Sequence, residues 1–279
     1  MSKESPGKRV PAPLGGVEPH AHLLKAPSDG QMLYKMMTVE NLLRSIRNSY
    51  LHFNRVDSYS DFPGADANDG RQLPKDLPGN ATAKFDSNPS FSAADYFNTS
   101  RARTYTCCFS LENSDFIWKN YASGSAKGKV CLVFDFAKLR SVINASMRPG
   151  NSALEHCGIK CHRIFSVNYG IVEYVAWDDH QANSDYIANP IKYTYLKSAE
   201  YCDEKELRIS LSAFGLGKFV LQDGSEMAFP SGLQMGFDFS AAFSDGTIPE
   251  ILYAADCDSD FLRSEMEKIR TSPRVDSPQ

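Results

Sequence analysis

No stretch of the 279-residue chain approaches the roughly 18 consecutive apolar residues that a membrane-spanning helix needs. The first 30 residues hold five prolines and four glycines, and they contain no apolar core of the signal-peptide kind. We therefore expect neither a membrane partner nor export, and the sequence favours a cytoplasmic protein.

Charge of either sign is not in large excess. The chain has 30 lysines and arginines against 34 aspartates and glutamates, which gives a formal net charge of −4. This balance gives no global reason to expect nucleic acid or a membrane surface as a partner. A small-molecule ligand fits the composition better.

Motifs for metals and disulfides are also missing. The seven cysteines are odd in number and scattered, a pattern typical of reduced thiols. The segment "HCGIKCH" (156–162) spaces its ligands too tightly for a structural zinc site, and "DFPGADANDG" (61–70) does not match a calcium loop. We expect no metal and interpret 61–70 as a flexible lid. Cys107 and Cys108 could act as nucleophiles through His52 or His162, or they could be inert buried thiols.

Two common nucleotide-binding folds are excluded by their fingerprints. There is no Walker phosphate loop and no glycine-rich turn after a strand, and "GLGKF" (215–219) is too short to hold a dinucleotide. No internal repeat and no Gly/Ser-rich or Pro-rich linker divides the middle of the chain. The sequence therefore predicts a disordered tail over 1–30, a single domain over 31–271 and a flexible tail over 272–279.

Hydrophobic periodicity predicts the elements of that domain. Thr38 is the expected N-cap of a helix with Val39, Leu42, Leu43 and Ile46 on its core face. Strands are predicted at 32–37, 50–59, 104–110, 129–136 and 204–213, with two adjacent strands within 160–177. Helices are predicted after Ser90, after Ser114, behind the strand 129–136, over 185–199 and after Asp256. We therefore predict an α+β fold of mostly antiparallel sheet with flanking helices.

The strand predicted at 204–213 carries the most ordered chemical pattern. Side chains alternate along a strand, so one face carries Glu204, Glu206, Arg208, Ser210 and Ser212, and the other carries Leu207, Ile209, Leu211 and Ala213. Residues two apart on a strand lie roughly 6.5 Å apart, close enough for two carboxylates to act on one ligand. The alternative is a solvent-exposed face on which Glu and Arg neutralise one another.

Six short motifs in a fixed order resemble a widespread bacterial family known as domain of unknown function 2971. They are "LYK" (33–35), "HFNRVDSY" (52–59), "CCFS" (107–110), "IWKNY" (117–121), "GKVCLVFDF" (128–136) and "EKELR" (204–208). The similarity covers most of the chain from Leu33 to Ile209. Tyr201 stands where the family carries a tryptophan. This resemblance implies no activity.

A second resemblance is to the ADP-ribosyltransferase fold, whose members cleave NAD at the nicotinamide–ribose bond. Those proteins carry a basic residue on an early strand, a Ser/Thr-bearing strand followed by a helix with an aromatic residue, and a late strand that starts with Glu-x-Glu. Here the matching places are Lys35 or Arg55, then "TCCFSLENSDFIWKNY" (106–121), then Glu204 and Glu206. Lys35 stands where Arg or His is usual, so Arg55 or Arg103 would supply forked contacts to phosphate.

This resemblance implies roles for individual side chains. Glu206 would stabilise the oxocarbenium-like ribose, and Glu204 would orient or deprotonate the incoming nucleophile. An aromatic ring would stack on the nicotinamide. The candidate ligand-binding residues are Tyr34, Lys35, His52, Asn54, Arg55, Arg103, Ser110, Trp118, Tyr121 and Arg208. For Trp118 the alternative is packing in the core.

Together these patterns give two hypotheses of function. The first is an enzyme that cleaves NAD or transfers ADP-ribose, acting as a toxin or defence effector, with NAD as its substrate. The sequence leaves open whether a nucleic acid or a protein would accept the transferred group. The second is a non-catalytic module that binds a ligand or partner in the same pocket.

Overall fold

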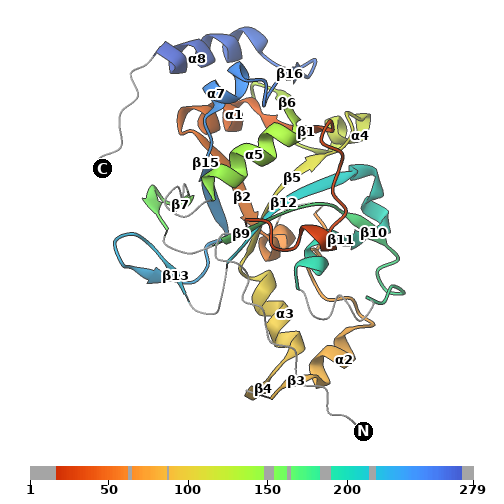
Figure 1. Ribbon diagram of the computed structural model, residues 1–279. Coiled ribbons are helices and arrows are strands. Elements are labelled where there is room, and N and C mark those ends of the chain that lie inside the picture. Colours follow the sequence, from red (N-terminus) through yellow and green to blue (C-terminus); the bar gives the residue numbers. More distant parts are fainter. Residues whose placement is uncertain are drawn as a thin grey trace.

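A mostly antiparallel sheet forms the centre of the molecule in a computed structural model (Figure 1). The structure describes residues 17–61, 65–86, 88–147, 154–161, 165–182, 190–213 and 218–271. Within these ranges the main sheet has ten strands, in the order β16-β6-β1-β5-β2-β15-β7-β8, and β12 and β9 extend it from β5. The predicted α+β class is confirmed at this level.

The strands of the main sheet are β1 Met32–Thr38, β2 Tyr50–Arg55, β5 Thr104–Ser110, β6 Lys129–Asp135, β7 Leu154–His156, β8 Ile159–Lys160, β9 Phe165–Ile171, β12 Glu206–Ala213, β15 Gly232–Gly236 and β16 Glu250–Tyr253. Three small sheets pair β3 Lys84–Phe85 with β4 Asn88–Ser92, β10 Glu173–Val175 with β11 Leu196–Ser198, and β13 Phe219–Val220 with β14 Glu226–Met227. Of these pairs only β10 and β11 run parallel.

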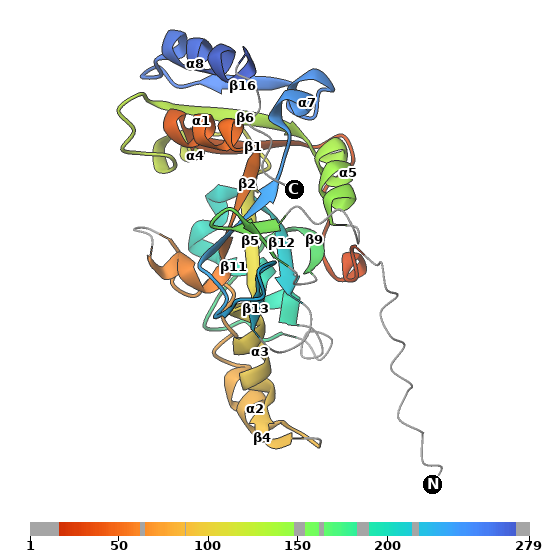
Figure 2. The same cartoon turned by 90° about the vertical axis from the view of Figure 1, so that its left-hand side faces the viewer.

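The helices are α1 Val39–Arg47, α2 Leu77–Thr82, α3 Ala93–Arg101, α4 Asp115–Asn120, α5 Phe136–Ser146, α7 Phe239–Ser244 and α8 Ser259–Thr271. Short 3₁₀ helices are η1 Ala21–Leu23, η2 Val56–Asp61, η3 Pro190–Tyr195 and η4 Ala199–Glu204. Two perpendicular views place α7, α8 and β16 at one end of the molecule and α2, α3 and the β3–β4 hairpin at the other (Figures 1 and 2). None of the helices in the described ranges is long and apolar enough to cross a membrane.

Local sequence signals explain the best-predicted elements. The hydroxyl of Thr38 accepts a hydrogen bond from the backbone of Asn41 and so caps α1, as predicted. The helix before β5 is capped by Ser92 and not by Ser90, because Ser92 and Asp95 form a reciprocal capping box. The acidic residue three positions after the cap therefore selects the helix start.

The two adjacent strands predicted within 160–177 are present as β9 and β10, which pair with β12 and β11 respectively and not with each other. Two other predicted elements are corrected. The strand expected over 50–59 ends at Arg55, and η2 begins at the next residue. The helix expected over 185–199 is replaced by η3 and β11 in its described part, and 183–189 lie outside the described residues.

The segment before Gln31 is also corrected, because the described chain packs onto the domain from Val17 on. The carbonyl of Val17 accepts from the backbone of Val167 on β9 at 2.8 Å. Glu18 forms an ion pair with Arg140 on α5. Order in the described chain therefore includes 17–30, which the sequence assigns to a disordered tail.

The main core lies on the apolar face of the sheet. Residues that alternate along β5 and β12 point into it, namely Tyr105, Cys107, Phe109, Leu207, Ile209 and Leu211, and all are buried. A second apolar cluster lies between α3, η3 and β11 and includes Phe97, Tyr193 and Leu196. The polar face of β5 and β12 therefore lies toward the part of the chain that carries η3, β11 and η4.

Candidate functional site

The polar face of β12 is buried, so the alternative of a solvent-exposed charged face is wrong. Glu206 is 6% exposed and Arg208 is fully buried. Segments 65–76 and 190–204 supply the groups that meet them. Charged groups taken out of water are stable only when they are paired and hydrogen-bonded. The pairing therefore decides what this face can do.

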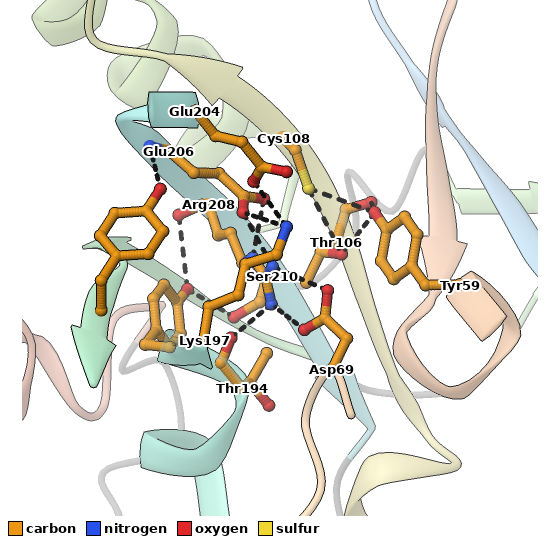
Figure 3. A network of polar contacts seen from close by, with 12 residues as sticks. Tyr59, Asp69, Thr106, Cys108, Thr194, Lys197, Glu204, Glu206, Arg208 and Ser210 are labelled. Carbon is orange, nitrogen blue, oxygen red and sulfur yellow. Dashed lines mark hydrogen bonds and ion pairs between the residues drawn. The ribbon is translucent and has the colours of Figure 1, made fainter. Parts of the chain in front are cut away.

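Arg208 lies at the centre of the network (Figure 3). Its Nε and Nη2 donate to the two carboxylate oxygens of Glu206, each at 2.8 Å. Its Nη1 and Nη2 donate to the two oxygens of Asp69, and Nη1 also donates to the carbonyl of Thr194 at 2.7 Å. All five N–H groups of the guanidinium are thus used. Arg208 has no donor left for a ligand, so its assignment as a ligand-binding residue does not fit this arrangement.

Lys197 of β11 provides the second buried cation. Its Nζ lies 2.5 Å from Oε2 of Glu204 and 3.5 Å from Oε2 of Glu206. The ammonium also lies 4.9 Å from the centre of the Tyr201 ring, a cation–π contact. Tyr201 therefore covers the cation that joins the two predicted catalytic carboxylates.

The pKa values of Glu204 and Glu206 are shifted in opposite directions. Burial alone would raise the pKa of Glu206, but Arg208 and Lys197 hold that pKa well below its usual range. Burial and the charge of Glu206 raise the pKa of Glu204, against the opposing effect of Lys197. The reason is geometric, since Glu206 has an arginine fork and Glu204 has only one ammonium. Glu206 thus favours its ionised form, whereas Glu204 takes up a proton more readily than an ordinary glutamate.

Asp69 and Lys197 complete the charge balance. Burial raises the pKa of Asp69, although Arg208 opposes this. Burial alone would lower the pKa of Lys197, but Glu206 and its neighbouring carboxylates raise it. The five buried charges are three carboxylates and two cations, so one negative charge remains when all carboxylates are ionised. A proton on Glu204 or on Asp69, whose pKa values are both raised, would remove this surplus.

Three strand positions line up beside these carboxylates. Tyr34 of β1 pairs with Ser110 of β5, and Ser110 pairs with Glu206 of β12, so their side chains share one face of the sheet. Ser110 donates to the carbonyl of Glu204 at 2.9 Å. Burial and the nearby charge of Glu204 raise the pKa of Tyr121, a residue that is 39% exposed. The structure thus brings together six sequence-predicted site residues: Tyr34, Ser110, Tyr121, Glu204, Glu206 and Arg208.

Lys35 lies where the sheet splits. β12 pairs with β5 along its whole length, so β1 and β2 must share the opposite edge, at Ser110 and at Tyr105–Thr106 respectively. Between these contacts the Nζ of Lys35 donates to the carbonyl of Cys108 at 3.1 Å. Where β1 and β2 diverge along β5, the side chain of Lys35 thus supplies a hydrogen bond to a β5 carbonyl.

The other predicted ligand-binding residues lie apart from Glu206. Arg55 pairs with Tyr105, five residues along β5 from Ser110, which corresponds to about 17 Å. Arg103 is buried and donates to Ser100 at 3.2 Å. In NAD, only one methylene group and one oxygen atom separate the nicotinamide ribose from the pyrophosphate. A ribose held at Glu206 would therefore leave the pyrophosphate too far from Arg55. Arg55 does not fit the pyrophosphate of an NAD held at Glu206.

His52, Asn54 and Trp118 are held by local partners. The Nε2 of His52 lies 3.0 Å from Oδ1 of Asn54, and His52 is exposed. The half-buried Trp118 donates from Nε1 to Asn113 at 2.7 Å. These contacts neither place the three residues against the carboxylates nor require a ligand.

The thiols are poor nucleophiles in this setting. Burial and the charge of Glu206 raise the pKa of Cys108, whose Sγ lies 3.2 Å from the hydroxyl of Tyr59. Cys107 is buried in the core. His162 lies outside the described residues. In the described part of the chain no three His, Cys, Asp or Glu side chains are grouped to hold a metal.

Close packing beneath Arg208 depends on Gly170 of β9, which pairs with Arg208. A Cβ there would lie 2.7 Å from two ring carbons of Tyr195, a buried residue whose hydroxyl is 2.8 Å from Ser210. We expect Gly170→Ala to lower the free energy of unfolding by about 1–3 kcal/mol through overpacking. Urea denaturation would measure this. Gly79→Ala on α2, where a Cβ meets nothing, is the control, and equal stability of both variants would contradict the prediction.

Sequence reasoning missed Lys197 and the pairing role of Asp69. Lys197 stands in a short aromatic-flanked segment, and Asp69 stands in a loop that the sequence assigns to a lid. Both reach Glu206 or Arg208 only after folding. The one signal for such partners in the sequence was the charge of the 204–208 face. If two carboxylates on that face are buried, cations from elsewhere in the chain must pair with them.

Comparison with protein-family models, with curated proteins and with solved structures gave no significant match to this chain.

Proposed function

We propose that the protein is an enzyme that cleaves NAD at the nicotinamide–ribose bond or transfers the ADP-ribose, with its site at the start of β12. The observation that supports this most is the pair Glu204 and Glu206, two carboxylates two residues apart whose pKa values move in opposite directions. Such divergence commonly marks groups with different roles in one reaction. An ADP-ribosyltransferase-like core is part of this proposal, and the divergence of β1 from β2 along β5 supports it.

The chemistry follows from these two charge states. When the ribose C–N bond breaks, its electron pair leaves with neutral nicotinamide, and the ionised carboxylate of Glu206 stabilises the cationic ribose. Water or an acceptor group then attacks the ribose, and Glu204 takes the proton that is released. The exposed ring of Tyr121 would stack on the nicotinamide. Consumption of NAD would explain a role as a toxin or defence effector.

Access to Glu206 defines the first step of binding. The ion pair between Lys197 and Glu206 is 3.5 Å long and is longer than the ion pairs that Lys197 forms with Glu204, at 2.5 Å, and that Arg208 forms with Glu206, at 2.8 Å. A ribose hydroxyl that replaces the ammonium at Glu206 would therefore leave the stronger pair intact. Arg208 remains behind Glu206 and fixes its carboxylate plane.

The test is nicotinamide release from NAD by the purified protein, with and without cell extract to supply an acceptor. We expect release in at least one of the two conditions. A folded protein that releases no nicotinamide in either condition would contradict the proposal.

The pH dependence of that reaction should depend on Glu204. Because its pKa is raised, nicotinamide release should fall with decreasing pH below a midpoint that lies above the usual glutamate value of about 4.3. Glu204→Gln should remove this limb of the profile. Rates measured from about pH 5 to 8 in wild type and variant would show it. A limb that persists unchanged in the variant would assign the titration to another group.

A non-catalytic binding module is the second candidate. It is favoured by the fact that Arg208 uses all its donors within the protein and that Glu206 is only 6% exposed. In that case the network only fixes 65–76 and 190–204 against the sheet, and the exposed Tyr121 belongs to a binding surface. Saturable NAD binding without nicotinamide release would select this candidate.

A further inference from the structure

Three arginines gather at the end of β2 and α3, away from the carboxylate pair. Arg55 is the last residue of β2, Arg101 is the last residue of α3, and Arg71 lies in the loop between η2 and α2. By the register of β5, Arg55 is about 17 Å from the level of Glu206. Nothing in the chemistry proposed for Glu206 uses this group.

Gly70 shows how close the three arginines are. A Cβ at Gly70, where φ is +67°, would lie 2.4 Å from a methyl of Val56 and 3.4 Å from Cγ of Arg101. Val56 follows Arg55 in the chain, and Arg71 follows Gly70. A side chain other than hydrogen would not fit at this position. The absence of a side chain thus lets the Arg71 loop pack directly on Arg101 and on Val56, the residue next to Arg55.

Protein groups satisfy these guanidiniums only in part. Arg55 donates from Nε to Asp57 at 2.5 Å and from Nη1 to a backbone carbonyl, and among the described residues its Nη2 has no acceptor. Arg101 donates from Nε to the carbonyl of Asp69 at 2.7 Å, whereas its buried Nη2 has no hydrogen-bond partner in the same described ranges. A buried donor without a partner costs about 1–3 kcal/mol. The group therefore favours an anion that accepts from Nη2.

The charges around Arg101 favour the same kind of ligand. Burial lowers the pKa of Arg101, and Arg71 and Arg55 lower it further, against Asp57 and Asp69. The side chain of Arg71 is exposed and has no ion pair in the described part of the chain. Since the Asp69 carboxylate is paired within the β12 network, the three arginines and Asp57 carry a combined formal charge of +2.

We propose that Arg55, Arg71 and Arg101 form a binding site for the phosphate group of a small phosphomonoester. A phosphomonoester carries close to two negative charges at neutral pH, which matches the local charge. Guanidinium forks match the oxygens of phosphate in geometry. A nucleic acid would require a basic stripe, whereas this is one compact group on a chain of net charge −4. The site does not depend on NAD cleavage.

Calorimetric titration with glycerol phosphate, inorganic phosphate and acetate tests the site. The variant is Arg71→Gln, because this exposed side chain forms no ion pair with the described residues and its loss should leave the fold intact. Arg44→Gln, which removes an exposed arginine from α1, is the control for net charge. We expect both phosphates to bind wild type, acetate to bind at least about 10-fold more weakly, and Arg71→Gln to weaken phosphate binding by about 10-fold or more.

Two results would overturn the site. One is the absence of saturable phosphate binding to wild type up to about 10 mM. The other is an equal loss of affinity in Arg71→Gln and Arg44→Gln, which would indicate nonspecific attraction. Arg101→Lys provides a second variant, since it keeps the charge and removes the fork, and it should also weaken phosphate binding. Circular dichroism and melting temperature confirm that each variant is folded.

Discussion

Arg208→Met is expected to lower the free energy of unfolding by about 3–5 kcal/mol, the typical cost of leaving buried partners of an ion pair without their counter-charge. The substitution removes five hydrogen bonds and strands Glu206 and Asp69 inside the protein. For a domain of this size the melting temperature should fall by roughly 6–20 °C. Thermal and urea denaturation followed by circular dichroism would measure both values.

Two further variants make this prediction sharp. Arg44→Met removes an exposed arginine from α1 and should change stability by less than about 0.5 kcal/mol. Adding Asp69→Asn and Glu206→Gln to Arg208→Met should restore part of the lost stability, because no buried charge is then left without a partner. If Arg208→Met lowers stability no more than the α1 control, the network does not hold segments 65–76 and 190–204 against the sheet.

The strand that carries this network shows what could be predicted from the sequence. Alternation along 204–213 correctly assigns Leu207, Ile209 and Leu211 to the core face, because strand side chains point to opposite sides of a sheet. The strand begins two residues later than predicted, since Lys205 adopts the left-handed conformation with φ of 46° and ends η4. The sequence does not indicate this turn, because lysine rarely adopts the left-handed conformation.

The burial of the polar face could not be predicted in the same way. Arg208 meets Asp69 across 139 positions of sequence, and the alternation within one strand carries no information about so distant a segment. The same limit applies to β10, which pairs in parallel with β11 and not with its neighbour β9. Periodicity reports which face is polar, and only tertiary structure decides whether that face meets water or a second layer.

Glu206→Gln should reduce nicotinamide release by about 10²-fold or more if the proposed function is correct, because the carboxylate acts mainly in the transition state. The variant removes one of the charges that pair with Arg208, so we also expect a lower melting temperature. The loss of rate must therefore be separated from the loss of stability. Rates should be measured well below the melting transition, with nicotinamide quantified directly.

Asp69→Asn supplies the matched control for that separation. Asp69 pairs with Nη1 and Nη2 of the same guanidinium, whereas Glu206 pairs with Nε and Nη2. Among the hydrogen bonds and ion pairs of the described residues, none joins Asp69 to Glu204 or Tyr121. Both variants should therefore lose stability because both remove a carboxylate from Arg208, whereas only Glu206→Gln should lose the bulk of its activity. Equal losses of nicotinamide release in the two variants would show that Glu206 acts by fixing Arg208, and equal release by Glu206→Gln and wild type would remove Glu206 from the reaction.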